Sequence, residues 1–285
     1  MRICQPSCTA YKVAMDIVTL GAKPGMDEVL PPGIVDATEK LLLESGVANE
    51  IQLRWSRSRG MVSVYEAFDW MLPGQFEAFG HRKAFFERHV RNEIGAGGAT
   101  QVLVLGAGYD TMGWRLAPEF SNVTFFEVDH PAAARLKAKG IKAMGQYDNL
   151  WLIPADLGKQ NSLDVLKSNA LWDQRARTVI VAEGLVMYLP HEAVQNLFCQ
   201  CAEIAGFDSR IVFSYLSTGT DGRPDAGLWT GLLLLILQIS GEPWLWSIRP
   251  EELGPFLKDT GWTNASEAAD AAYKHGVEFY GVATK

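Results

Sequence analysis

Four acidic residues follow short apolar runs in the middle of the chain, and their spacing suggests a binding site. They are Asp110, Asp129, Asp156 and Glu183. Carboxylates accept hydrogen bonds from hydroxyl and amino groups and attract positive charge. If the fold brings the four residues together, they could hold a polar ligand that carries a positive charge.

The runs that precede these acids have the character of buried strands. Beyond residue 95 such runs alternate with helix-compatible sequence, which is typical of a parallel sheet. We expect strands at 101–105, 123–128, 150–155, 177–183 and 210–216, with a late strand at 277–283 at or near the sheet edge. Their continuous apolar character predicts helices on both faces. Because parallel strands end at one edge, the four acids should meet there.

Residues 1–95 are mostly helical by pattern, with apolar residues three and four apart in 35–43 and 76–94. We interpret them as an N-terminal cap or lid that is integral to the domain. Residues 96–285 would form the core, with an inserted helical segment near 218–260. A length of 285 residues allows one large domain or two small ones.

The turn after the first strand, Gly106-Ala107-Gly108, can bring bare backbone close to a ligand. A dinucleotide fingerprint would need a third small residue where Thr111 stands, and the carboxylate of Asp110 would repel a pyrophosphate. S-adenosylmethionine suits the site better, because it has a free ribose, two positive groups and no phosphate. Asp129 would accept from the ribose, and Asp156 with Leu157 would hold the adenine.

The same residues resemble the leucine carboxyl methyltransferase family, among the class I S-adenosylmethionine-dependent methyltransferases, and its bacterial branch of secondary metabolism in particular. The resemblance covers roughly residues 80 to 217. It rests on Gly106 to Thr111 with Arg115-Leu116, Phe126 to Pro131 with Lys137, Ala155 to Leu157, and Ala182 to Pro190.

The resemblance implies an α/β, Rossmann-like fold with a mostly parallel seven-stranded sheet, helices on both faces and a helical cap. It also implies cofactor contacts. Arg82 would bind the methionine carboxylate, Glu183 the amino group, Asp129 the ribose, and Asp156 with Leu157 the adenine. Gly106, Gly108 and Asp110 would line the cofactor from the glycine turn. Lys12 is a further candidate for the carboxylate.

The implied activity is O-methyl transfer to a carboxylate, or to a hydroxyl, of a small molecule or peptide. A carboxylate is already ionised near neutral pH, whereas a phenol needs a general base. Tyr188 is the candidate catalytic residue, and Tyr215, Trp244 and Arg249 are candidate substrate contacts. An NAD-dependent oxidoreductase and a non-catalytic nucleoside-binding protein remain as alternatives.

The composition of the chain disfavours several classes of binding partner. The chain has 26 basic and 33 acidic residues and a net charge of −7, which disfavours nucleic acid and anionic membranes. It lacks HExxH and paired CxxC motifs, so we expect no metal. Its longest apolar run, 232–237, is too short to span a bilayer, and its start lacks an apolar signal segment, so we expect a cytoplasmic protein. The apolar residues of 228–246 could line an acceptor pocket or a homodimer contact.

Overall fold

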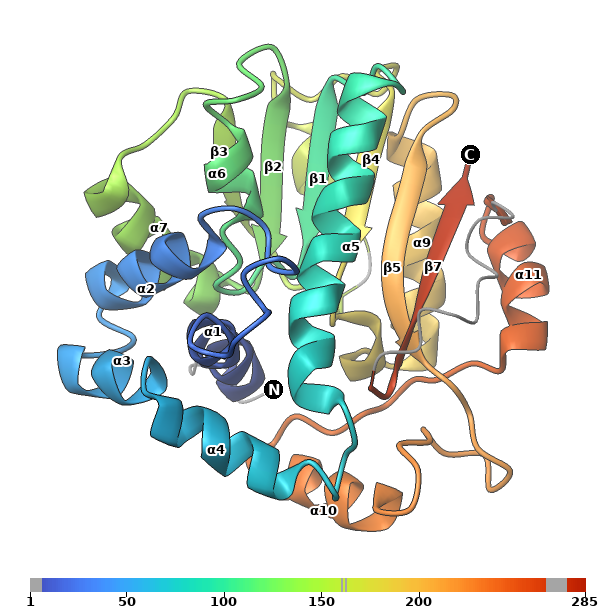
Figure 1. Cartoon of the computed structure of the whole chain (residues 1–285). Coiled ribbons are helices and arrows are strands. Elements are labelled where there is room, and N and C mark those ends of the chain that lie inside the picture. The colour runs from blue at the N-terminus through green and yellow to red at the C-terminus, as the bar shows by residue number, and fades with distance from the viewer. Residues whose placement is uncertain (1–6, 160, 162, 265–275) are drawn as a thin grey trace.

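The computed structural model describes residues 7–159, 161, 163–264 and 276–285. A sheet runs through the centre of this part of the chain, with the order β3-β2-β1-β4-β5-β7-β6 (Figure 1). Strand β7 is antiparallel to both of its neighbours, and the other pairings are parallel. The strands are β1 (Gln101–Leu105), β2 (Thr124–Asp129), β3 (Leu150–Pro154), β4 (Thr178–Ala182), β5 (Arg210–Leu216), β6 (Thr263–Asn264) and β7 (Glu278–Thr284).

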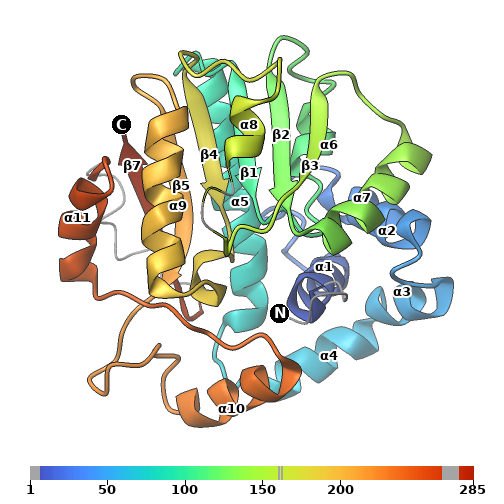
Figure 2. The same cartoon turned by 180° about the vertical axis from the view of Figure 1, so that it is seen from behind.

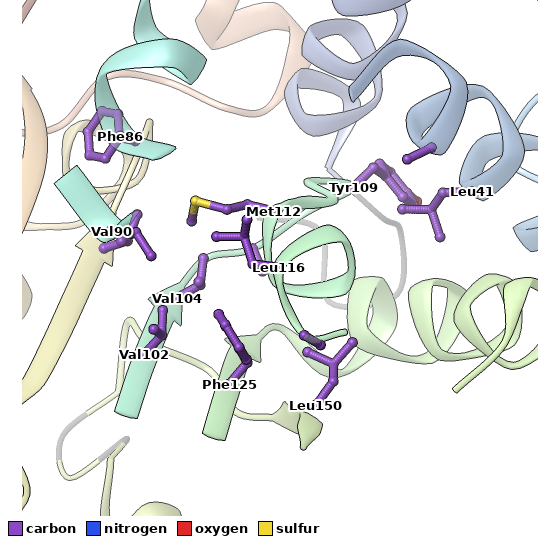
Figure 3. Packing of buried hydrophobic residues seen from close by; sticks show 14 of the residues in the cluster. Leu41, Phe86, Val90, Val102, Val104, Tyr109, Met112, Leu116, Phe125 and Leu150 are labelled. Atoms are coloured by element: carbon purple, nitrogen blue, oxygen red, sulfur yellow. The ribbon is translucent and has the colours of Figure 1, made fainter. Parts of the chain in front are cut away.

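The sheet is buried on both faces, as its continuous apolar strands predict. In β1, Val102 and Val104 belong to one core cluster, while Leu103 and Leu105 belong to another. Successive side chains of a strand point to opposite faces, so a strand between two helical layers must be apolar at every position. Figure 3 shows the first cluster, in which Val102 and Val104 pack near Phe86 and Val90.

Helices cover both faces of the sheet (Figures 1 and 2). Buried residues of α5 (Gln75–Gly95), α6 (Met112–Leu116) and α7 (Pro131–Met144) join the first cluster, together with residues of the N-terminal helices described below. The helices that join the second cluster are α8 (Asp164–Lys167), α9 (His191–Ile204) and α11 (Pro250–Asp259). A short 3-10 helix, η1 (Val186–Tyr188), follows β4.

The remaining helices gather mainly at the carboxyl edge of the parallel strands, with α2 also packing on α7 (Figure 1). They are α1 (Cys8–Leu20), α2 (Ile34–Ser45), α3 (Glu50–Ser56), α4 (Arg59–Phe68) and α10 (Thr230–Ser240). A separate apolar cluster that includes Ile17, Leu20 and Ile34 holds part of this group together. Helix α5 belongs to the N-terminal helical region in sequence but packs along the sheet. No helix in the described segments is both long and apolar enough to cross a bilayer.

A buried ion pair joins β2 to α7 below the carboxyl edge of the sheet. Nζ of Lys137 lies 2.5 Å from Oε2 of Glu127, and each side chain is only 2% exposed. Burial raises the pKa of Glu127, and the positive charge of Lys137 opposes that rise. Removing the cation would leave a buried carboxylate without its partner, which is strongly destabilising.

We therefore predict that Lys137→Met lowers the free energy of unfolding by about 3–5 kcal/mol, measured by urea denaturation. Adding Glu127→Gln to that variant should recover much of the loss, because no unpaired charge then remains buried. Lys142→Met, an exposed change in the same helix, serves as the control and should leave stability nearly unchanged. Wild-type stability in Lys137→Met would contradict a structural role for the pair.

Candidate active site

A cavity of 430 Å³ lies at the carboxyl edge of the sheet, between the strand ends and the cap. Its floor includes Gly106, Asp129 and Glu183, which follow or end the first, second and fourth strands. Its walls include Lys12 from α1 and Leu237 from α10. The edge at which parallel strands end is the usual place for ligands in open α/β sheets.

Most residues that the sequence suggested for the site line this one cavity. The structure brings together Arg82, Gly106, Gly108, Asp110, Asp129, Asp156, Leu157, Glu183, Tyr188 and Trp244. The four strand-end acids therefore converge, as the expected parallel sheet requires.

Two suggested substrate residues lie elsewhere, which corrects their expected placement. Tyr215 is inside β5, and its ring stacks on Phe279 with 5.6 Å between centroids, in the core behind the cavity. The alternation of side chains along the strand turns it into that layer. Arg249 caps α11 at the surface, where it forms ion pairs with Glu251 and Glu252 of the first helical turn.

The turn after β1 depends on glycine. Gly106 has a φ of 65°, and a Cβ there would lie 2.8 Å from Cδ1 of Leu185. Gly108 has a φ of 49°, and a Cβ there would lie 3.1 Å from Cβ of Ala10. A side chain would be strained at either position and would push into its neighbours. The glycines therefore leave backbone exposed to the cavity.

Asp129 is held in place by backbone N–H groups. Gly108 N donates to its Oδ2 at 2.6 Å, and His130 N donates to its Oδ1 at 2.6 Å. Burial raises the pKa of Asp129, and these two hydrogen bonds oppose the rise. Each carboxylate oxygen can accept more than one hydrogen bond, so both oxygens remain able to bind a pair of hydroxyls.

Asp156 and Leu157 form a different part of the wall. Leu157 is buried and packs in the second core cluster, whereas the Asp156 side chain is 38% exposed. Gly158 N donates to Oδ1 of Asp156 at 3.1 Å. Oδ2 of Asp156 lies 3.7 Å from Nζ of Lys159. The pair offers an apolar surface beside an acceptor oxygen, as a flat heterocycle with an amino group requires.

Two cations and three carboxylates form a network at the opposite side of the cavity. Nε of Arg82 lies 2.9 Å from Oε1 of Glu183, and its Nη1 contacts Glu278. Nζ of Lys83 lies 2.8 Å from the same oxygen of Glu183 and contacts Asp110. Burial alone would raise the pKa of Asp110, but the charge of Lys83, aided by that of Lys137, holds it below its usual range.

Three buried polar atoms of the cavity residues have no hydrogen-bond partner among the described residues: Oε2 of Glu278, Nε1 of Trp244 and the hydroxyl of Tyr109. Such orphaned groups are rare in folded proteins because each one costs free energy. A ligand with donor groups would satisfy the carboxylate oxygen. Burial raises the pKa of Tyr109 to about 12, with Asp129 adding to the rise, so this hydroxyl keeps its proton.

The sequence did not reveal Glu278, although it lies in an expected strand. It is the first residue of β7 and pairs with Leu216, the last residue of β5. Because β7 is antiparallel, its beginning lies at the edge where the other strands end. The apolar pattern of 277–283 indicates a strand but not its direction, so this carboxylate could not be placed at the site in advance.

A second polar group lies under the cap, around Tyr188. Oε2 of Glu242 accepts from Thr9 N at 2.7 Å and also from the Thr9 hydroxyl. Thr9 and Trp244 also lie beside Tyr188, whose pKa is raised by burial. At neutral pH the Tyr188 phenol is therefore protonated and acts as a hydrogen-bond donor, not as a base.

Two mycobacterial proteins are similar to part of this chain. A protein of Mycolicibacterium paratuberculosis that carries the name of an S-adenosyl-L-methionine-dependent methyltransferase is 30% identical over 140 residues, which cover 49% of this chain and 43% of that protein. One of Mycobacterium tuberculosis with the same name is 31% identical over 121 residues, covering 42% and 38%. The matched segments thus span less than half of either relative.

The fold also matches solved structures. A crystal structure of a protein from Thermobifida fusca, named as a methyltransferase, superposes with a TM-score of 0.60 at 20% identity, over 92% of this chain and 97% of that one. At this identity the match establishes the Rossmann-like methyltransferase fold alone. The family model described as leucine carboxyl methyltransferase matches residues 34–202, more than half of the sequence. The chain therefore belongs to the leucine carboxyl methyltransferase family.

Proposed function

We propose that this protein binds S-adenosylmethionine in the cavity and transfers its methyl group to an oxygen atom of a small molecule or peptide. The observation that carries the proposal is the convergence of Asp110, Asp129, Asp156 and Glu183 with the glycine turn on one cavity. Family membership supports the same cofactor. When bound, S-adenosylmethionine supplies a methyl group on a positively charged sulfur.

The described residues fit each part of this cofactor. Asp129 offers two anchored oxygens to the ribose hydroxyls, and Asp156 with Leu157 suits the adenine. Oε2 of Glu278, which has no partner, would accept from the ammonium together with Glu183. A guanidinium has five N–H donors and an ammonium three, so Arg82 and Lys83 keep donors for the methionine carboxylate beyond their ion pairs.

The charge of the wall favours this cofactor over a pyridine dinucleotide. Among the lining residues that the structure describes, six are carboxylates and three are lysine or arginine. A ligand of net positive charge relieves the repulsion between the carboxylates, whereas a pyrophosphate would increase it. The cavity thus supports an S-adenosylmethionine-dependent reaction and not the oxidoreductase that remained open from the sequence.

Methyl transfer is an in-line displacement, so the main task of the protein is to hold the acceptor oxygen about 3 Å from the methyl carbon. Tyr188 can orient that oxygen by donating a hydrogen bond from its neutral phenol. The apolar side chains of α10 that line the cavity, such as Leu233 and Leu237, would keep water away from the reacting atoms.

Asp129→Ala tests the ribose assignment. We expect the variant to lose about 1–3 kcal/mol of binding free energy for S-adenosylmethionine, measured by calorimetry, because the hydroxyls lose their acceptors. Asp148→Ala, which removes an exposed carboxylate near β3, is the matched control and should bind normally. Unchanged affinity in Asp129→Ala, or tighter binding of NAD than of S-adenosylmethionine to the wild type, would contradict the proposal.

Gly106→Ala tests the close approach of the backbone. The new Cβ would combine a strained φ with a contact to Leu185 at the cavity, whereas Gly25→Ala has the same kind of φ, 82°, in open space. Both variants should lose about 1–2 kcal/mol of stability from the backbone conformation. Only Gly106→Ala should also weaken cofactor binding in calorimetry. Equal cofactor affinity in the two variants would argue against contact at this turn.

A further inference from the structure

We propose that the methyl acceptor is an apolar hydroxyl compound of the phenol class, and that Glu242 binds its hydroxyl and takes its proton. This inference rests on the proposed function and narrows it, because the sequence alone favoured a carboxylate acceptor. It comes from the charges of the cavity, the position of Glu242 and the apolar wall beside it.

The cations of the described cavity wall are already paired. Nζ of Lys12 lies 3.0 Å from Oδ2 of Asp16, a fully buried carboxylate. Arg82 and Lys83 contact the carboxylates of their own network, and the proposed function assigns their remaining donors to the methionine carboxylate of the cofactor. Each lysine and arginine of the described wall thus already contacts a carboxylate of the protein, so none brings an unpaired positive charge to an acceptor carboxylate.

The wall also has an excess of negative charge. Its six described carboxylates against three cations leave three negative charges: the acids are Asp110, Asp129, Asp156, Glu183, Glu242 and Glu278. S-adenosylmethionine carries two positive groups and one negative group, so its binding removes only one of the three. A second carboxylate entering this partly dry space would be repelled and would lose its hydration.

The excess negative charge of the wall also disfavours an amine as the acceptor. An amine would be attracted, but nearby carboxylates stabilise its protonated form. A protonated amine has no lone pair with which to attack the methyl group. A neutral hydroxyl suffers neither penalty, and a phenol, with a pKa near 10, releases its proton to a base more readily than an aliphatic alcohol does.

Glu242 is placed to bind such a hydroxyl. Its residue is 8% exposed, it lines the cavity, and its Oε2 is fixed by the backbone N–H and hydroxyl of Thr9. Thr9 also contacts Tyr188, whose charge environment includes Glu278 and Arg82. Glu242 is therefore linked through Thr9 and Tyr188 to the network that would hold the methionine end, near which the acceptor must approach the methyl group.

The surface next to Glu242 is apolar. The apolar wall residues of the cavity that lie near Glu242 in the chain are Trp244 from the same segment and Leu233, Ile236 and Leu237 from α10, the helix that ends at Ser240. Apolar and aromatic side chains of this kind bind a flat hydrocarbon body and leave its polar group to a few fixed partners. Tyr188 as a donor and Glu242 as an acceptor are such partners for one hydroxyl.

The reaction balances without a further reagent. The acceptor oxygen forms a bond to the methyl carbon while the carbon–sulfur bond breaks and leaves its electron pair on sulfur. The hydroxyl proton passes to the carboxylate of Glu242 and then to water. The products are a methyl ether, S-adenosylhomocysteine and one proton.

The test compares 2-naphthol with 2-naphthoic acid, which share one apolar body. Their binding is measured by calorimetry at neutral pH to protein saturated with sinefungin, a cofactor analogue in which an amine replaces the methyl sulfonium. We expect naphthol to bind at least about tenfold more tightly than naphthoate, because only the anion meets the excess negative charge. Equal or tighter binding of naphthoate, or binding of neither compound, would overturn the proposal.

Glu242→Gln tests the residue itself. The substitution removes one negative charge and keeps the shape of the side chain. It should weaken the binding of naphthol and strengthen the binding of naphthoate, so that the ratio of the two affinities falls about tenfold. Glu251→Gln removes the same charge from the surface outside the cavity and should keep the wild-type preference. An unchanged preference in Glu242→Gln would refute the role of this residue.

Sinefungin binding, measured first, separates this inference from the proposed function. If the wild type fails to bind sinefungin and S-adenosylmethionine, the proposed function itself is wrong. If both bind and Glu242→Gln binds sinefungin as the wild type does, any failure in the naphthol and naphthoate comparison concerns the acceptor alone.

Discussion

Carboxylates confined to one buried edge of a sheet repel each other, and the buried cations among them make the arrangement possible. Arg82 and Lys83 lie between the carboxylates of the cavity wall, and Lys137 lies beneath them. The charge of Lys137 lowers the pKa of Asp110. It also opposes the rise in pKa that burial causes at Glu127 and Asp129. In our proposal, stability and cofactor binding depend on the same balance of charges, because a positively charged ligand would offset the remaining carboxylates.

The topology of the sheet determines which carboxylates lie together at the carboxyl edge. Parallel strands bring the four strand-end acids to one edge, and the single reversed strand, β7, adds Glu278 from the opposite end of its own sequence. The cap covers the cavity at the carboxyl edge of the strands. There, the hydrogen bonds between Thr9 and Glu242 join segments more than 230 residues apart. In our proposal the sheet would hold the nucleoside, and the cap and α10 would surround the acceptor.

Much of the sheet and of the cofactor wall could be predicted from the sequence. Continuous apolar runs located β1 and β5 at their observed bounds, because a strand buried on both faces leaves a distinct pattern. The four acids could be grouped because parallel strands must end at a common edge. These predictions needed only local patterns and one rule of topology.

The acceptor side could not be predicted in the same way. Tyr215 lies near the end of β5, as expected, but the alternation of side chains along the strand turns its ring into the core. Arg249 is held at the surface by the acids of its own helix. The position of Glu242 depends on a long-range contact with Thr9, and a contact of that kind leaves no local pattern.

A crystal structure of the protein with S-adenosylhomocysteine would test the central claim most directly, that the carboxyl edge is an anionic cavity for a nucleoside without phosphate. We expect the ribose hydroxyls on Asp129, the adenine beside Asp156 and Leu157, and the amino group within hydrogen-bond distance of Glu183 and Glu278. A nucleoside bound elsewhere, or one whose amino group lies far from both glutamates, would contradict it.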